Sequence, residues 1–234
     1  MNGAGNAFIL VDARGEPSPV RISAGQIRNW AQRWAFDQLL VLEDSDRADA
    51  FMRIWNADGD EVGACGNGTR AAAWQMMENT GRQHAAIDTR AGILLAERKP
   101  GREISVDMGI PRLDWRDIPL ARQMDTVSLD FRTEIDGIRI ENPGAVNMGN
   151  PHAVFFVRDL ENLPVERLGR EVEFDPVFPE RVNAGFAQIH DPAHIRLRVW
   201  ERGAGLTPAC GTGACAALVA AHRRALALTG VSQK

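Results

Sequence analysis

The sequence predicts an α/β protein, more closely an α+β protein, built from two pseudo-symmetric halves. Segments with strand-type and helix-type patterns alternate along the chain, and the second half repeats the order of the first. In addition, residues 54–69 (IWNADGDEVGACGNGT) align without gaps to residues 199–214 (VWERGAGLTPACGTGA). A repeat of this kind indicates two copies of one structural unit.

In the first half, a helix is expected to begin at Ser23. Ser23 is a typical N-cap, Gln26 completes a capping box, and the apolar residues that follow have helical spacing. Strands are expected at 37–43 and 51–55, a helix over 66–79 that Gly81 closes, and a hairpin of 93–97 with 103–107.

The second half gives a matching series of elements. Strand-type segments cover 128–140, 153–157, 184–189 and 195–200, with helices near 165–172 and from 211 to about 228. The stretch from Arg112 to Leu120, which has mixed charge and the prolines Pro111 and Pro119, is the expected boundary. It divides the chain into a domain of residues 1–113 and a domain of residues 114–234.

Composition argues against several classes of function. The chain has 234 residues with 44% hydrophobic and 25% charged residues, which is typical of globular proteins, and its net charge of −4 argues against binding nucleic acid. No apolar run approaches the ~20 residues that span a membrane, and no signal-peptide pattern is visible. Three cysteines without a C-x-x-C pair argue against a disulfide framework or a zinc site. A cytoplasmic protein is expected, and His222-Arg223-Arg224 is expected to be a solvated helix face.

The repeat extends well beyond a single turn. A-C-G-x-G could be a strand-to-helix turn that occurs twice by chance, but distant residues match as well. The pairs at an offset of 145 are Gln38 with Asn183, Trp55 with Trp200, Cys65 with Cys210, Gly66 with Gly211, and Gly68 with Gly213, and Gly5-Asn6 matches Gly149-Asn150 at 144.

Cys65 and Cys210 each follow a strand and precede a glycine-rich helix start. The free N–H groups and partial positive charge of a helix N-terminus favour a thiolate and can bind a carboxylate. Two such helix starts on one substrate suit inversion of the carbon next to its carboxylate. One thiolate removes the α-proton and the opposite thiol supplies a proton. Cys215 is expected instead to be a small buried hydrophobic residue.

The chain resembles the diaminopimelate epimerase family over essentially its whole length. Eight segments in the same order carry the resemblance, and together they are specific. They are GNAF at 5–8, FDQLL at 36–40, NADG at 56–59, ACGNG at 64–68, GNPH at 149–152, RVN at 181–183, ERGAG at 201–205 and ACGTG at 209–213.

The resemblance implies two mirrored domains of mixed sheet, each around a central helix, and a cofactor-independent isomerase. It implies interconversion of L,L- and meso-diaminopimelate in lysine and peptidoglycan-precursor biosynthesis by a cytoplasmic homodimer. Cys65 and Cys210 would be the acid/base pair, with Glu201 and His152 assisting. The substrate-binding residues would be Gly66, Asn67, Gly211 and Thr212 at the reacting carboxylate, and Asn6, Gln38, Asn56, Asn150, Asn183 and Arg202 around the rest of the substrate.

Two features depart from the family pattern. Trp34 runs directly into Ala35-Phe36, where the family has a glycine-containing loop, and this puts the position of Gln38 in doubt. The family also continues with further strands after the second cysteine helix, whereas this sequence stops at Lys234.

Other functions remain open at this stage. A proline or hydroxyproline racemase also inverts a carbon between two cysteines, but a cyclic imino acid does not need Glu201-Arg202 and several asparagines. The paired cysteines disfavour a lyase-like relative that uses a carboxylate. From other classes, a thiol redox sensor would use low-pKa cysteines. A phosphate-binding module would use the glycine-rich turns, although no lysine follows either turn.

Overall fold

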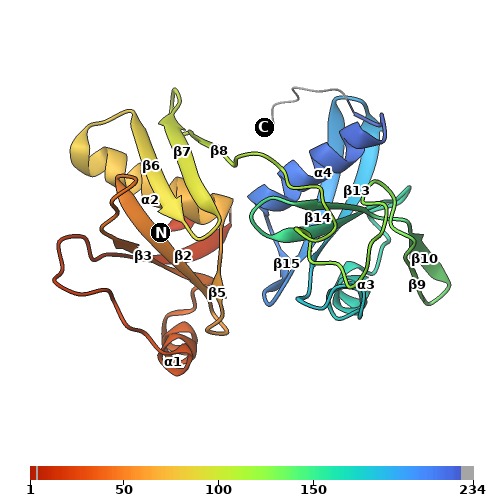
Figure 1. Ribbon diagram of the computed structural model, residues 1–234, viewed down its shortest axis with the longest axis horizontal. Helices are drawn as coiled ribbons and strands as arrows, with labels where there is room; N and C mark the ends of the chain where they lie inside the picture. The colour runs from red at the N-terminus through yellow and green to blue at the C-terminus, as the bar shows by residue number, and fades with distance from the viewer. Residues whose placement is uncertain (4, 228–234) are drawn as a thin grey trace. The chain divides into compact units, whose positions relative to one another are not determined.

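The computed structural model describes residues 1–3 and 5–227, and it divides the chain into two compact units, Met1–Gly109 and Ile110–Lys234 (Figure 1). The backbone of Arg112 exchanges hydrogen bonds of 2.9 and 3.0 Å with Asn147 in both directions. This bridge joins Arg112 to the second unit. The division after Gly109 falls four residues before the division after residue 113 that the sequence predicts.

The first unit is a mixed eight-stranded sheet with two helices. The strand order is β1-β2-β3-β4-β6-β7-β8, and β5 pairs with β4. The strands are β1 (Asn2–Gly3), β2 (Asn6–Asp12), β3 (Gln38–Glu43), β4 (Ala50–Asn56), β5 (Glu61–Val62), β6 (His84–Thr89), β7 (Gly92–Arg98) and β8 (Ile104–Asp107), and the helices are α1 (Ala24–Trp34) and α2 (Gly66–Thr80).

The second unit has a five-stranded sheet, a separate two-stranded hairpin and two helices. The larger sheet has the order β11-β12-β13-β14-β15, and β9 pairs with β10. The elements are β9 (Arg132–Ile135), β10 (Ile138–Glu141), β11 (Gly144–Asn147), β12 (Pro151–Phe156), α3 (Val165–Glu173), β13 (Asn183–Asp191), β14 (His194–Glu201), β15 (Gly205–Thr207) and α4 (Gly211–Arg223).

The two sheets confirm the repeat that the sequence predicts. β2 and β3 are parallel, as are β12 and β13, while β3–β4 and β13–β14 are antiparallel. The register repeats as well, because Leu39 lies opposite Trp55 and Ala184 opposite Trp200, each number higher by 145. The fold is therefore a mixed α+β architecture with an internal duplication.

Helix α2 is the central helix of the first unit. It contacts β1, β2 and β3 as well as β6, β7 and β8. Its residues Ala72, Ala73 and Met77 are buried in the same core as Leu40 and Ile54. Because both sets of strands cover it, the start of α2 is held in one position relative to β3 and β4. In the second unit, α4 contacts β11, β12, β13 and β14.

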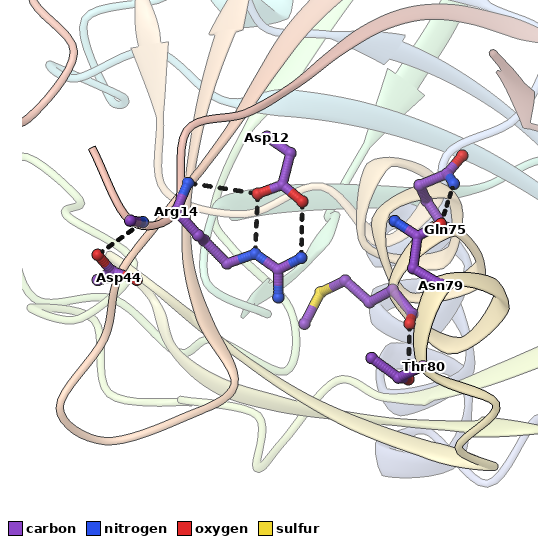
Figure 2. Close-up of polar contacts among 8 residues, drawn as sticks. Asp12, Arg14, Asp44, Gln75, Asn79 and Thr80 are labelled. Carbon is purple, nitrogen blue, oxygen red and sulfur yellow. Dashed lines mark hydrogen bonds and ion pairs between the residues drawn. The ribbon is translucent and has the colours of Figure 1, made fainter.

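Local signals explain where the helices of the first unit begin and end. Ser23 and Gln26 form the expected capping box, with Ser23 Oγ accepting from Gln26 N–H at 3.3 Å. α2 ends as expected at Gly81, which is in the left-handed region at φ 71°. Near that end, Gln75 donates to Asn79 at 2.9 Å (Figure 2). The same view shows Arg14 bound through two nitrogens to Asp12 at the end of β2.

Residues 128–140 do not form one strand-type segment, which corrects the sequence prediction. The strands β9 and β10 are separated by a tight turn at Asp136 and Gly137, both with positive φ, and they form their own two-stranded sheet. The sequence prediction also missed β11, whose four residues are all buried. A short buried strand has no alternation of polar and apolar residues to reveal it.

Helix α4 ends at Arg223, earlier than the predicted end near Leu228, and Leu228 itself lies outside the described residues. Ala225 has φ 53°, so the backbone leaves the helix there. Arg223 and Arg224 are not a solvated face, because they donate to the backbone carbonyls of Thr126 at 3.2 Å and Val127 at 2.8 Å. Each guanidinium thus ties the end of α4 to the loop before β9.

Candidate active site

Cys65 is the N-cap residue of α2. Its backbone is extended, and its Sγ accepts a hydrogen bond from the N–H of Gly68 at 3.3 Å. A Cβ atom at Gly68 would lie 3.0 Å from the side chain of Leu40, so only glycine fits there without displacement. This close packing of the first turn on β3 holds the thiol at the end of the strand layer.

Two asparagines lie together in the first unit. The Asn67 side-chain amide, one residue past the start of α2, donates to Asn6 Oδ1 at 2.7 Å, and both residues are buried. The guanidinium of Arg70, one helical turn further, hydrogen-bonds to Asn67 Oδ1. Asn6, at the start of β2, follows Gly5 at φ 93°. The predicted residues Asn6 and Asn67 are thus in direct contact.

Gln38 and Asn56 form a second polar pair on neighbouring strands. Gln38 is opposite Asn56 in the β3–β4 register, and its Nε2 donates to Asn56 Oδ1 at 2.8 Å. The register fixes the position of Gln38, which the short connection after Trp34 left in doubt. Gln38 Oε1 is buried and has no hydrogen-bond partner among the described residues. Buried polar atoms nearly always have a partner, so this oxygen is a candidate ligand contact.

Cys210 is the N-cap residue of α4 and repeats the geometry of Cys65. Its Sγ accepts from the N–H of Gly213 at 3.3 Å and lies 3.5 Å from Thr212 Oγ1. A Cβ atom at Gly213 would lie 2.9 Å from Val199. The N-cap role that the glycine-rich turns predict is therefore present in both units.

The pKa of the Cys210 thiol is raised well above its ordinary value, which corrects the expectation of a resting thiolate at this residue. Burial is the main cause, and the negative charge of Glu201 adds to it. The hydrogen bonds from Thr212 and Gly213 lower the pKa but are outweighed. Cys210 therefore rests as a thiol, beside a carboxylate whose Oε1 accepts from Thr207 Oγ1. For Cys65, the thiolate stays a prediction.

His152 is fully buried in the second unit. Its Nε2 lies 3.0 Å from Asn150 Oδ1 and 3.1 Å from Thr212 Oγ1, which joins three predicted site residues. Burial, with a smaller contribution from the charge of Arg202, lowers the pKa of His152 to about 3. The ring is neutral near pH 7. Its Nδ1 is buried without a partner among the described residues, like the oxygen of Gln38.

Asn183 connects two further segments of the second unit. Its Nδ2 donates to the carbonyl of Pro151 at 2.7 Å, and its Oδ1 accepts from the backbone N–H of Arg202 at 2.9 Å. The Arg202 guanidinium donates to the carbonyl of Glu180 at 2.9 Å. Arg202 thus lies on the turn after β14, directly beyond Glu201.

The structure brings the predicted residues together in pairs and small groups within each unit. The first unit brings together Asn6 with Asn67 and Gln38 with Asn56, and it places Gly66 directly after Cys65 at the start of α2. The second unit brings Glu201 close to Cys210, and it brings Asn150 and Thr212 into contact with His152. Gly211 opens α4.

Cys215 and two supporting residues differ from the sequence-based picture. Cys215 is only partly buried rather than buried. The sequence gave no signal for Thr207, which bonds to Glu201, or for Glu173, which bonds to the backbone of the turn after β14. Neither residue has a chemical match at its counterpart position in the first half. Among the described residues, no group of three or more metal-ligating side chains is present and no helix is long and apolar enough to cross a bilayer.

Comparison with known proteins agrees with this arrangement. The family model described as diaminopimelate epimerase matches residues 1–113 and 144–231. A diaminopimelate epimerase of Phenylobacterium zucineum is 53% identical over 229 residues, which cover 97% of this chain and 82% of the relative. That of Acidiphilium cryptum is 52% identical over 228 residues, with 97% and 81% covered.

Solved structures share the fold at low sequence identity. A hydroxyproline epimerase from Agrobacterium vitis matches with a TM-score of 0.63 and 17% identity, covering 97% of this chain and 77% of the other. A predicted epimerase from Pseudomonas aeruginosa matches with a TM-score of 0.60 and 15% identity, covering 97% and 79%. The family model and the sequence relatives extend over both cysteine-bearing halves, and the chain belongs to the diaminopimelate epimerase family.

Proposed function

We propose that this protein is an isomerase that interconverts L,L- and meso-diaminopimelate by proton transfer at the α-carbon, with Cys65 and Cys210 as the two acid/base groups. The observation that carries the proposal is the N-cap cysteine that is present in both units. The sulfur of Cys65 accepts from the N–H of Gly68, and the sulfur of Cys210 accepts from the N–H of Gly213. The family membership and the names of its relatives support the substrate.

The reacting carboxylate would bind at the two helix starts. Free N–H groups at a helix N-terminus attract an anion, and the glycines allow close approach of the backbone. Gly66 and Asn67 would contribute from α2, and Gly211 and Thr212 from α4. The same dipoles would stabilise negative charge that develops when the α-proton leaves.

The two cysteines would start the reaction in different states. Cys210, with its raised pKa, holds its proton and would serve as the resting acid. Cys65 has the neutral Asn56 at the sequence position that corresponds to Glu201, so no carboxylate at that position opposes a thiolate. In the reverse direction, Glu201 would help to remove the proton from Cys210, and His152 would hold Thr212 and assist near the α-amino group.

The remaining polar residues would hold the rest of the substrate. A substrate with an amino-acid group at each end requires several neutral donors and acceptors and a cation for its distal carboxylate. Arg202 would supply the cation. The neutral groups would be Asn6, Gln38, Asn56, Asn150 and Asn183, of which Gln38 has an unpartnered buried oxygen.

The wider biological setting is part of the proposal. We propose that the protein needs no cofactor, acts in lysine and peptidoglycan-precursor biosynthesis, and works as a cytoplasmic homodimer.

Exchange of solvent deuterium into the α-carbon of diaminopimelate tests the mechanism. Cys65→Ala and Cys210→Ala should each lower epimerisation at least 10³-fold, because each removes the proton-handling group on one face. Cys215→Ala is the matched control and should keep activity within about twofold, since Cys215 takes no part in the proposed chemistry. Activity near the parent level in either of the first two variants would contradict the two-base mechanism.

A further inference from the structure

Glu173 is a buried carboxylate that the proposed reaction does not use. It is the last residue of α3, and its side chain is 3% exposed. Its Oε2 accepts from the indole N–H of Trp200 at 2.7 Å, and its Oε1 accepts from the backbone N–H of Gly203 at 3.0 Å. Arg181 lies 3.5 Å from Oε1. A charge is costly to bury, so a carboxylate with this set of partners is held in a defined position.

The group that Glu173 holds is the turn between β14 and β15. Three consecutive backbone N–H groups of this turn are all bonded. The N–H of Arg202 donates to Asn183 Oδ1, and the N–H of Gly203 donates to Glu173 Oε1. The N–H of Ala204 donates to the carbonyl of Glu201. Glu173 thus fixes the middle of the turn, directly beside the two proposed site residues that begin it.

The helix that carries Glu173 is in close contact with β14. Gly169 lies one helical turn before Glu173, and a Cβ atom there would lie only 2.4 Å from Trp200 Cβ. α3 therefore packs directly on the Trp200 side chain at Gly169, where a larger residue would not fit. The carboxylate at its end is positioned by both the helix and the indole.

The first unit has a tether at the equivalent place. Arg28 of α1 precedes Glu173 by 145 residues, and Asp58 precedes Gly203 by the same number. Arg28 Nη1 donates to the carbonyl of Asp58 at 3.0 Å. In both units, then, one helix side chain bonds to the backbone of the corresponding turn residue, at its carbonyl in the first unit and at its N–H in the second. A helix-to-turn contact is thus present in both halves, although its chemistry differs.

We propose that Glu173 is a positioning residue, whose buried carboxylate holds the 201–204 turn so that Glu201 stays beside Cys210 and Arg202 stays oriented for the substrate. This inference rests on the proposed function for its effect on turnover. Its effect on Cys210 does not require a substrate, because Glu201 contributes directly to the raised pKa of that thiol.

The test compares Glu173→Gln with Val172→Ala. Glutamine keeps the shape but offers one acceptor and one N–H₂ group, so Trp200 or Gly203 loses its partner. We expect at least a tenfold lower kcat for Glu173→Gln, with a higher KM for diaminopimelate. Val172 is fully buried on the same helix, and its truncation lowers the melting temperature without changing the carboxylate. At temperatures at which Val172→Ala remains folded, its kcat should stay within about twofold of the parent value.

The second readout is the pH dependence of Cys210 alkylation by iodoacetamide, followed by peptide mass spectrometry. If Glu201 moves away, the pKa of the Cys210 thiol falls, so the alkylation midpoint of Glu173→Gln should shift to lower pH by about half a unit or more. Val172→Ala should keep the parent midpoint. An unchanged midpoint together with a kcat within twofold would overturn the proposal. A parent protein that does not epimerise diaminopimelate would instead refute the proposed function, and the midpoint would still decide the role of Glu173.

Discussion

At the scale of single residues, the two cysteines differ although their helices repeat each other. Burial and, after it, the charge of Glu201 raise the thiol pKa of Cys210, while the position that corresponds to Glu201 in the first half is Asn56. His152 likewise corresponds to the apolar Phe8. At these two positions the second half therefore carries ionisable side chains and the first half does not, and this asymmetry favours Cys210 as the resting acid of the proposed reaction.

Protonation of His152 should destabilise the folded protein below pH 6.5. Its pKa is about 3 in the folded state and 6.5 for an unperturbed histidine, so between these values the unfolded chain binds more protons. Stability therefore rises with pH across this window and falls as the pH drops, by up to about 1.4 kcal/mol per pH unit. Between pH 7 and pH 5, urea unfolding should show a loss of about 2 kcal/mol that is absent in His152→Gln. Equal pH dependence of the two proteins would contradict this.

Arg202→Lys should raise the KM for diaminopimelate at least tenfold and change kcat much less. A guanidinium binds a carboxylate through two nitrogens in one plane, and an ammonium group does not reproduce that geometry. Steady-state kinetics provide the measurement. Arg196→Lys is a suitable control, since Arg196 lies on β14, the strand that precedes Arg202, in an exposed ion pair with Glu161. Parent-like KM in Arg202→Lys would remove Arg202 from the binding site.

At the scale of elements, the sequence predicts most of what positions the site. Local residue types determine three of these features, and they can be recognised in the sequence alone. They are the capping box at Ser23, the end of α2 at Gly81 and the cysteine N-caps. The repeat predicts two halves of like structure, which the matching strand registers confirm. β11 and the turn at Asp136 were missed because burial and positive φ there depend on surrounding structure. The pKa direction of Cys210 was missed for the same reason, since the burial of the thiol and its proximity to Glu201 arise only in the folded chain.

Gly213→Ala should lower kcat strongly and change the melting temperature only slightly. The added Cβ would lie 2.9 Å from Val199 Cγ2 and 3.2 Å from Cys210 Sγ, so the first turn of α4 or the thiol must shift. A displacement of this size in a catalytic group costs up to about 10²-fold in rate. Gly185→Ala on β13 is the control, because its Cβ would meet only ordinary contacts at 3.6 Å or more. Deuterium exchange and thermal unfolding of both variants would separate the two effects, and equal rates would count against the close fit at Cys210.

At the scale of the whole molecule, the duplication determines both the framework and the chemistry. Each half contains a parallel strand pair, an antiparallel continuation and a helix that begins at a cysteine. Each half also ties its turn to a helix, through Arg28 in one and Glu173 in the other. The proposed reaction uses one proton-handling group on each face of the carbon, and the duplicated unit would provide one cysteine from each half.

Mild oxidation should join Cys65 to Cys210 and abolish activity until the disulfide is reduced. The proposed reaction requires both sulfurs to approach one α-carbon to within about 3–3.5 Å, one on each face. The two sulfurs would then lie about 6–7 Å apart with substrate bound. Without substrate we expect that gap to close to a disulfide under an added oxidant, since an S–S bond is about 2 Å long. Peptide mapping under non-reducing conditions should recover the Cys65–Cys210 pair, and saturating diaminopimelate should slow its formation. Cys215, which has no role in the proposed site, should remain unlinked. Formation of a Cys65–Cys215 or Cys210–Cys215 disulfide in its place, or full activity after Cys65 and Cys210 are joined, would refute a site shared by the two cysteines.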